Sequence, residues 1–153
     1  METHAFDFVA MLHLIMLSLW GGVVATEAVI EVLPFRQRDL HPATIRFHYW
    51  IDLLVELPLV LAVIATGATL FFMTDTVTPL LLVKIGLGGA AVGINLFCIV
   101  VVVKRGRRLR AHADEDGLWR SSRTVLACFA TGLLCAAGAA TLGFRFAIER
   151  LSQ

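Results

Sequence analysis

The sequence has little charge and few residues that interrupt a helix. Asp, Glu, Lys and Arg make up 16% of the 153 residues, and only four residues are proline. Typical soluble domains carry about 25% charged residues, so this composition excludes a soluble globular domain. With a formal net charge of +1, the chain also lacks the basic surface typical of nucleic-acid binding, and we expect no nucleic-acid partner.

Cysteine is also scarce, and all three cysteines (Cys98, Cys128 and Cys135) fall within apolar stretches. An odd number of cysteines in such stretches predicts small apolar packing residues rather than a disulfide framework. The N-terminal segment carries Glu2 and Asp7 in place of a basic head, and the apolar run that follows is long. We therefore expect no cleavable signal peptide.

The dominant feature of the sequence is a set of long apolar runs, at residues 6–33, 45–73, 80–103 and 118–148. Each exceeds the roughly 20 residues that a membrane-spanning helix needs. The connections between them are short, which favours antiparallel neighbours. The sequence therefore predicts one integral membrane domain over residues 1–153, folded as an all-α, up-down-up-down four-helix transmembrane bundle.

The basic residues are distributed unevenly between the connections. Arg36, Arg38 and Arg46 lie around the first connection, five Lys or Arg residues lie in 104–110, and the second connection, Thr74–Pro79, has none. Cytoplasmic connections are enriched in Lys and Arg. This pattern predicts that both termini lie outside the cytoplasm, in a multi-pass protein of a bacterial-type inner (cytoplasmic) membrane.

Acidic residues occur inside only the first two of the apolar runs. His48, Asp52 and Glu56 are spaced i, i+4, i+8, which places them on one helix face. Antiparallel pairing of the first two runs at the basic connection brings Glu27 and Glu31 level with these residues. Antiparallel pairing of the second and third runs adds the amide of Asn95. Such groups inside a membrane face the protein interior and need partners.

Four carboxylates and one imidazole form an oxygen-rich ligand set, which suits Fe, Mn or Zn better than Cu(I). The sequence therefore predicts a transition-metal site at Glu27, Glu31, His48, Asp52, Glu56 and Asn95. Two alternatives remain: an interfacial ion-pair network of Glu31, His48 and the arginines, and a proton path through the carboxylates. Pro58 cannot donate a backbone hydrogen bond, which predicts a kink or a free carbonyl beside the cluster.

A second polar group is predicted in the outer half, where His13, Lys84 and Arg145 lie at similar heights. His13 is either a hydrogen-bonded packing residue or an axial ligand of haem b. Lys84 either extends to the surface or, like Arg145, neutralises a propionate or substrate carboxylate.

The segment from His13 to Gly21, HLIMLSLWG, resembles the first span of the HemJ-type protoporphyrinogen oxidases. The spacing from Lys84 to Asn95 and Cys98, before a basic stretch, is similar too, as is the Pro58–Gly67 pattern; the wider relatives are CopD-like four-helix membrane proteins. The resemblance implies a b-type haem or tetrapyrrole site and oxidation coupled to the respiratory chain. His13 and Lys84 match that family's functional His and Lys, while Asn95 stands where some members have His.

The carboxylate cluster has no counterpart in that resemblance, which suggests the same scaffold with a metal-centred task. We therefore expect a metal- and/or haem-binding redox protein of the membrane and, if it is an enzyme, a membrane oxidoreductase. A divalent-cation or proton carrier is the second hypothesis. The third is a structural or assembly subunit, which forms a homo-oligomer or joins a larger complex through the glycine-rich faces of the third and fourth runs.

Overall fold

The described residues form long helices and no strand, which confirms the predicted all-α four-helix bundle. The computed structural model describes residues 2–74, 76–111 and 115–151, with side chains for 4–74, 76–111 and 115–143. The elements in chain order are α1 (Glu2–Arg36), the 3₁₀ turn η1 (Arg38–Leu40), α2 (His41–Ile51), the π-helical turn η2 (Asp52–Glu56), α3 (Leu57–Phe72), α4 (Pro79–Arg110) and α5 (Glu115–Leu151).

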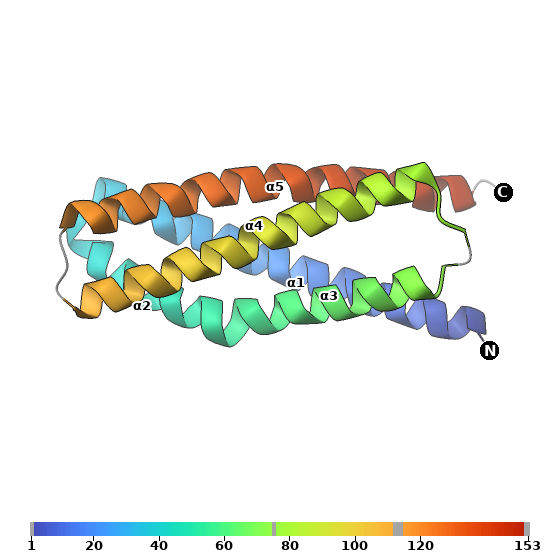
Figure 1. The fold of residues 1–153 in the computed structure, drawn as a ribbon, viewed down its shortest axis with the longest axis horizontal. Coiled ribbons are helices and arrows are strands. Elements are labelled where there is room, and N and C mark those ends of the chain that lie inside the picture. The colour runs from blue at the N-terminus through green and yellow to red at the C-terminus, as the bar shows by residue number, and fades with distance from the viewer. Residues whose placement is uncertain (1, 75, 112–114, 152–153) are drawn as a thin grey trace.

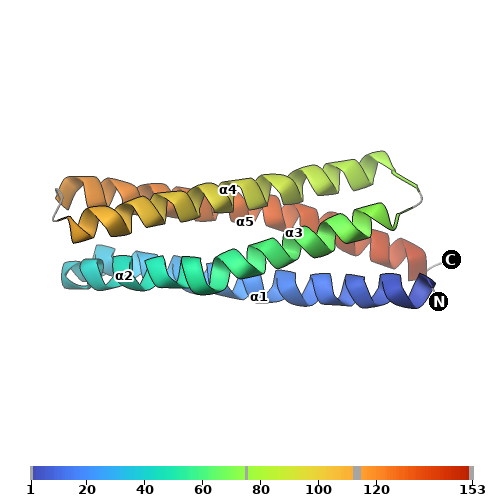
Figure 2. The same cartoon turned by 60° about the horizontal axis from the view of Figure 1, so that its bottom comes forward.

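The segments α2, η2 and α3 form one continuous rod, so the bundle has an up-down-up-down course (Figure 1). The start of α1, the α3–α4 connection and the end of α5 lie at one end of the bundle. The α1–α2 connection, the end of α4 and the start of α5 lie at the opposite end, which we call the basic end because it carries Arg36, Arg38 and the 104–110 segment. Figure 2 shows α1 with α2–α3 in one layer and α4 with α5 in the other.

Four helical segments are long and apolar enough to cross a membrane: His4–Arg36, Arg38–Phe72, Pro79–Arg110 and Glu115–Gly143, with mean hydropathies of 2.0–2.3. Their outer faces carry large apolar side chains such as Phe72, which is 84% exposed, whereas several charged side chains are buried. This inside-out distribution fits a lipid environment. The chain is a multi-pass membrane protein.

Several helices extend beyond the predicted spans, and two of these extensions are the longer C-terminal ends of α1 and α4. The helix α1 continues through Pro34 to Arg36, and α4 continues through residues 104–110, which the sequence assigned to a connection. Lys and Arg are good helix formers, and they are favourable near a helix C-terminus because the backbone dipole is negative there. The longer α4 matters because it turns the side chain of Arg105 into the bundle.

The π-helical turn η2 lies where Pro58 predicted a local break in the second span. The N–H of Leu57 donates to the carbonyl of Asp52, an i to i+5 bond. Pro58 has no N–H, so the turn before it is released from regular α-helical bonding. Single π turns are frequent at functional sites, and this one carries both Asp52 and Glu56.

Two apolar clusters fill the interior. One contains Trp20, Val60, Val63 and Ala91, and the other contains Cys98, Val102, Val125 and Phe129. Trp20 of the first cluster contacts Glu56, and Phe129 of the second stacks on His48 with ring centroids 5.7 Å apart. The buried polar residues therefore border both clusters.

The glycine-rich face of α4 does not mediate packing within the described part of the bundle. A Cβ atom added at Gly86, Gly88, Gly89 or Gly93 would meet no atom within 4 Å. The expected docking of another chain on this face remains a prediction.

Candidate metal centre

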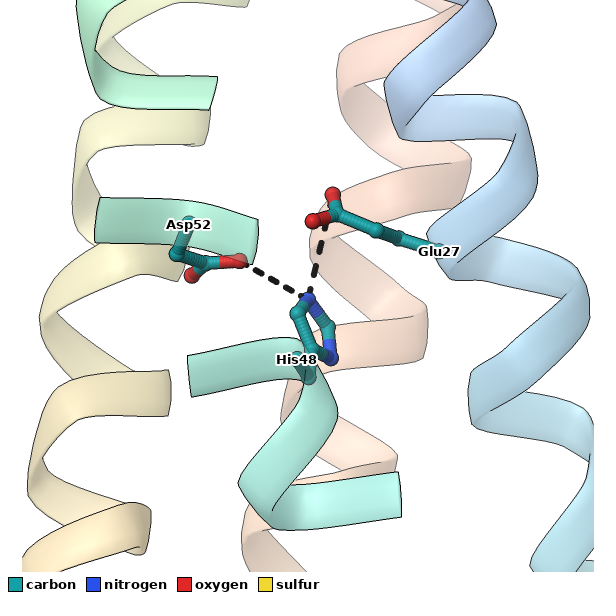
Figure 3. Close-up of side chains that lie close together, drawn as sticks. All are labelled: Glu27, His48 and Asp52. Carbon is teal, nitrogen blue, oxygen red and sulfur yellow. Dashed lines mark ion pairs between the residues drawn. The ribbon is translucent and has the colours of Figure 1, made fainter. Parts of the chain in front are cut away.

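Three side chains from two neighbouring rods meet in the interior. Glu27 comes from α1, His48 from α2 and Asp52 from η2, and each is at most 1% exposed. One ligand atom from each residue lies within 4.8 Å of the others. The Nε2 atom of His48 is 3.2 Å from Asp52 Oδ1 and 3.9 Å from Glu27 Oε2 (Figure 3). We call these three residues the triad.

The other ring nitrogen of His48 is held from outside the triad. His48 Nδ1 lies 2.8 Å from Glu31 Oε2 and 3.2 Å from Arg105 Nη2. A carboxylate only accepts and a guanidinium only donates, so the shorter contact to Glu31 places the imidazole proton on Nδ1. The lone pair of Nε2 then faces Glu27 and Asp52, as Figure 3 shows.

Glu31 is engaged by a buried arginine. Arg105, which is fully buried, donates from Nη1 to Glu31 Oε1 and from Nη2 to Glu31 Oε2 at 2.9 Å. Its Nη1 atom also donates to Ser122 Oγ at 2.8 Å, and His41 Nε2 lies 3.0 Å from the same hydroxyl. Glu31, predicted as a metal ligand, is therefore part of an ion-pair network with Arg105 and His48. This is the network that the sequence left open as an alternative.

Glu56 and Asn95, also predicted as ligands, pair with each other rather than with the triad. Asn95 Nδ2 donates to Glu56 Oε1 at 2.6 Å, and Trp20 Nε1 approaches the same oxygen at 3.4 Å. All three side chains are buried. Glu56 therefore has two neutral donors from neighbouring helices.

The triad is less completely hydrogen-bonded than this pair, in which only Asn95 Oδ1 lacks a described partner. Seven buried side-chain atoms of the described residues lack a hydrogen-bond partner, and five of them belong to the triad: both oxygens of Glu27, both oxygens of Asp52, and His48 Nε2. Buried polar atoms are paired in the great majority of cases. Acceptor atoms that face one another without a donor repel, so the triad requires positive charge at its centre, supplied by protons or by a cation.

Sequence reasoning missed Arg105 and Ser122. Arg105 looked like one of several interfacial basic residues in 104–110. Its spacing of seven from Cys98 and three from Val102, both buried, was the available signal that it shares the inner face of α4. Ser122 offered no comparable signal.

The predicted outer group is dispersed by comparison. His13 Nδ1 lies 2.7 Å from Thr66 Oγ1 on α3, and Lys84 lies beside Gly143 of α5. No hydrogen bond or ion pair joins His13 to Lys84 among the described side chains. The side chain of Arg145 lies outside the described residues.

No protein-family model, curated protein or solved structure matches this chain. The resemblance to the HemJ-type oxidases stays a prediction, and the function is inferred from the chemistry of the site.

Proposed function

We propose that this membrane protein binds one divalent transition-metal ion through Glu27, His48 and Asp52. The observation that carries the proposal is that three buried side chains, whose five acceptor atoms lack partners among the described residues, bring one ligand atom each within 4.8 Å of the others. A divalent cation neutralises the two carboxylates of the triad and uses the lone pair of His48 Nε2. Glu31 needs no share of this charge, because Arg105 already neutralises it.

The hydrogen bonding of the second ring nitrogen of His48 also favours a metal ion. Metal-binding histidines almost always donate their second ring N–H to a carboxylate, carbonyl or water, which fixes the ring and its tautomer. Glu31 has this role here, and Arg105 and Ser122 hold Glu31 in turn. This arrangement keeps the proton on Nδ1 and leaves the lone pair of Nε2 free to bind a metal ion.

The donor set of one imidazole and two carboxylates suits Fe, Mn or Zn. Three protein ligands leave coordination positions for water or a substrate, as in catalytic metal sites. Iron or manganese would supply redox chemistry there, which would make the protein a membrane oxidoreductase. Zinc would supply only Lewis-acid chemistry.

A carrier of divalent cations or protons is the second candidate, and the succession of buried acids along the bundle favours it. Glu31, the triad and Glu56 occupy successive levels from the basic end towards the middle. Proton relays and ion pathways in membranes use such carboxylates. Metal uptake or pH change in protein-containing liposomes distinguishes a carrier from a fixed metal centre.

A haem or tetrapyrrole site at His13 is supported by the hydrogen bonding of Thr66. The Thr66 hydroxyl donates to the carbonyls of Ala62 and Val63, at 2.8 and 3.2 Å, so towards His13 it accepts. His13 Nδ1 then carries the proton, and its Nε2 atom keeps a lone pair for iron. A b-type absorption spectrum that His13→Ala abolishes is expected if this proposal holds. Protein without a Soret band after incubation with haemin would rule against it.

The metal proposal is tested by elemental analysis of protein purified in detergent. We expect about one Fe, Mn or Zn ion per chain in the wild type and a loss of at least about tenfold in Glu27→Gln, because one of the three ligands is removed. Asp7→Asn is the control, since it neutralises an exposed acid of the same helix. Wild-type protein with no metal above the control buffer would refute the proposal.

A further inference from the structure

A groove at the basic end carries two arginines that form no ion pair with any described acid. The groove measures about 360 Å³ and is lined by Arg46, Tyr49, Trp50, Gly106 and Arg110. It lies between α2 and α4, and its lining includes no Asp or Glu. We call it the arginine groove. It is separate from the triad, whose side chains do not line it.

The wall of the arginine groove is built by a close approach of two helices. A Cβ atom at Gly106 would lie 2.7 Å from Tyr49 Cδ2, so only glycine lets the tyrosine ring rest against α4. The Arg110 guanidinium then sits over this ring, 4.9 Å from its centroid. Its Nε atom also donates to the Gly106 carbonyl at 3.4 Å. Stacking and this bond orient the guanidinium, and its remaining N–H groups stay available.

Arg46 supplies the second charge. Its side chain is exposed, and among the described residues it forms no ion pair or hydrogen bond. Two guanidinium groups around one hollow, without a carboxylate, attract an anion. Arginine favours phosphate because its planar N–H groups pair with two oxygens at once.

The position of the groove favours a phosphate carried by a lipid. Trp50, which lines the groove, is 56% exposed, and the neighbouring Phe47 also presents its ring outward. Both flank Tyr49, which contacts Gly106 and Arg110 at the basic end of α4, and both belong to a helical segment that is apolar and long enough to cross a membrane. Tryptophan at that level belongs to the interfacial aromatic belt, where lipid headgroups lie. The groove therefore opens where a headgroup and the start of an acyl chain would meet it.

We infer that the arginine groove is a binding site for the phosphate group of an anionic phospholipid. Basic pockets between membrane helices are suited to such headgroups, and each basic residue near the membrane surface strengthens the attraction. The inference does not depend on the metal proposal, since the groove is lined by none of Glu27, His48 and Asp52, and no hydrogen bond or ion pair joins them to a groove residue within the described structure.

The test is native mass spectrometry of detergent-purified protein incubated with dioleoyl phosphatidylglycerol or, separately, with dioleoyl phosphatidylcholine. We expect the wild type to retain phosphatidylglycerol preferentially. The double variant Arg46→Gln/Arg110→Gln should weaken this retention by about 30-fold, because it removes two basic residues that each strengthen lipid binding between about five- and sixfold. Arg107→Gln/Arg108→Gln removes the same charge outside the groove and should retain the lipid as the wild type does.

A second variant changes the shape of the groove without changing its charge. Gly106→Ala pushes Tyr49 away and should lower retention of phosphatidylglycerol while the triad keeps its metal. Equal loss in both arginine double variants would show a general electrostatic attraction and overturn the proposal. Equal retention of the two lipids would overturn it as well. Inorganic phosphate that competes the lipid off at millimolar concentration would assign the groove to free phosphate instead.

Discussion

The polar residues in the two halves of the bundle differ in how deeply they are buried and in how many chain segments contribute to one site. Towards the basic end, Glu27, Glu31, His48, Asp52 and Arg105 converge from four chain segments and are fully buried. In the other half, His13 is only partly buried and pairs with a single threonine, while Lys84 lies beside a glycine. A site that can hold a cation needs several helices to contribute at one level, and one histidine among apolar residues does not create it.

The halves also differ in how completely the polar atoms are satisfied. The hydroxyl of Thr66 bonds both His13 and its own backbone, so nothing described there calls for a further ligand to balance charge. Around the triad, five buried atoms have no hydrogen-bond partner within the described residues. The excess of unpaired acceptor atoms, rather than burial alone, is the reason for proposing a cation site in the basic half.

The largest expected effect comes from removing the arginine that anchors the basic half. Arg105→Ala leaves Glu31 as a buried charge without its partner. Loss of one member of a buried ion pair costs about 3–5 kcal/mol, so the free energy of unfolding should fall by that amount. Denaturant unfolding in detergent micelles measures it. Arg107→Ala, on the exposed side of α4, should change the value by less than about 1 kcal/mol.

The next effect concerns metal affinity, which is measured separately from the stability that is lost when Arg105 loses its charged partner. Glu31→Gln keeps an oxygen for the His48 N–H but removes the negative charge that polarises the ring. Loss of such outer support lowers metal affinity by about 10- to 100-fold. Competition with a chelator of known affinity measures this change. Glu115→Gln, at an exposed acid in the first turn of α5, should leave the affinity unchanged.

Glu56→Gln tests whether Glu56 is a metal ligand or only a neighbour of the triad. Glu56 accepts hydrogen bonds from Asn95 and Trp20 and is not a member of the group of ligand atoms. Because an amide oxygen accepts the same bonds, bound metal should remain within about threefold of the wild type. A loss as large as that of Glu27→Gln would make Glu56 a ligand and extend the site. If the protein is a carrier, transport in liposomes should fall in this variant although binding persists.

The smallest effect is expected in the outer half. Thr66→Val preserves the shape of the side chain but removes the hydrogen bond to His13. One such bond contributes about 1 kcal/mol, and the bound metal should not change. Thermal unfolding and elemental analysis of the same sample test both statements. A loss of metal in Thr66→Val would show that metal binding depends on the outer half, and would contradict the distinction between the two halves.

The fold was predictable from the sequence because its signals are long and regular. The apolar runs specify four spans, and the i, i+4 spacing of His48 and Asp52, with antiparallel pairing, predicts their approach to Glu27. Arg105 was not predictable from composition, since it sits within a run of basic residues. Its spacing from Cys98 and Val102 places it on the inner face only because α4 continues through residues 104–110, and its partner on α1 shows that it turns inward. Antiparallel pairing places Asn95 level with Glu56, but whether the amide bonds Glu56 or a bound ion depends on side-chain geometry, which spacing does not resolve.

Differential chelation of the wild type and Asp52→Asn tests metal binding by the triad most directly. A ligand that binds only the folded state adds its binding free energy to stability. A membrane-permeant chelator should therefore lower the melting temperature of the wild type. Asp52→Asn should start without metal, melt at a lower temperature than the wild type, and respond little to the chelator. Wild-type protein that carries no metal, ignores the chelator and melts no higher than Asp52→Asn would contradict the proposal and identify the triad as a set of protonated acids.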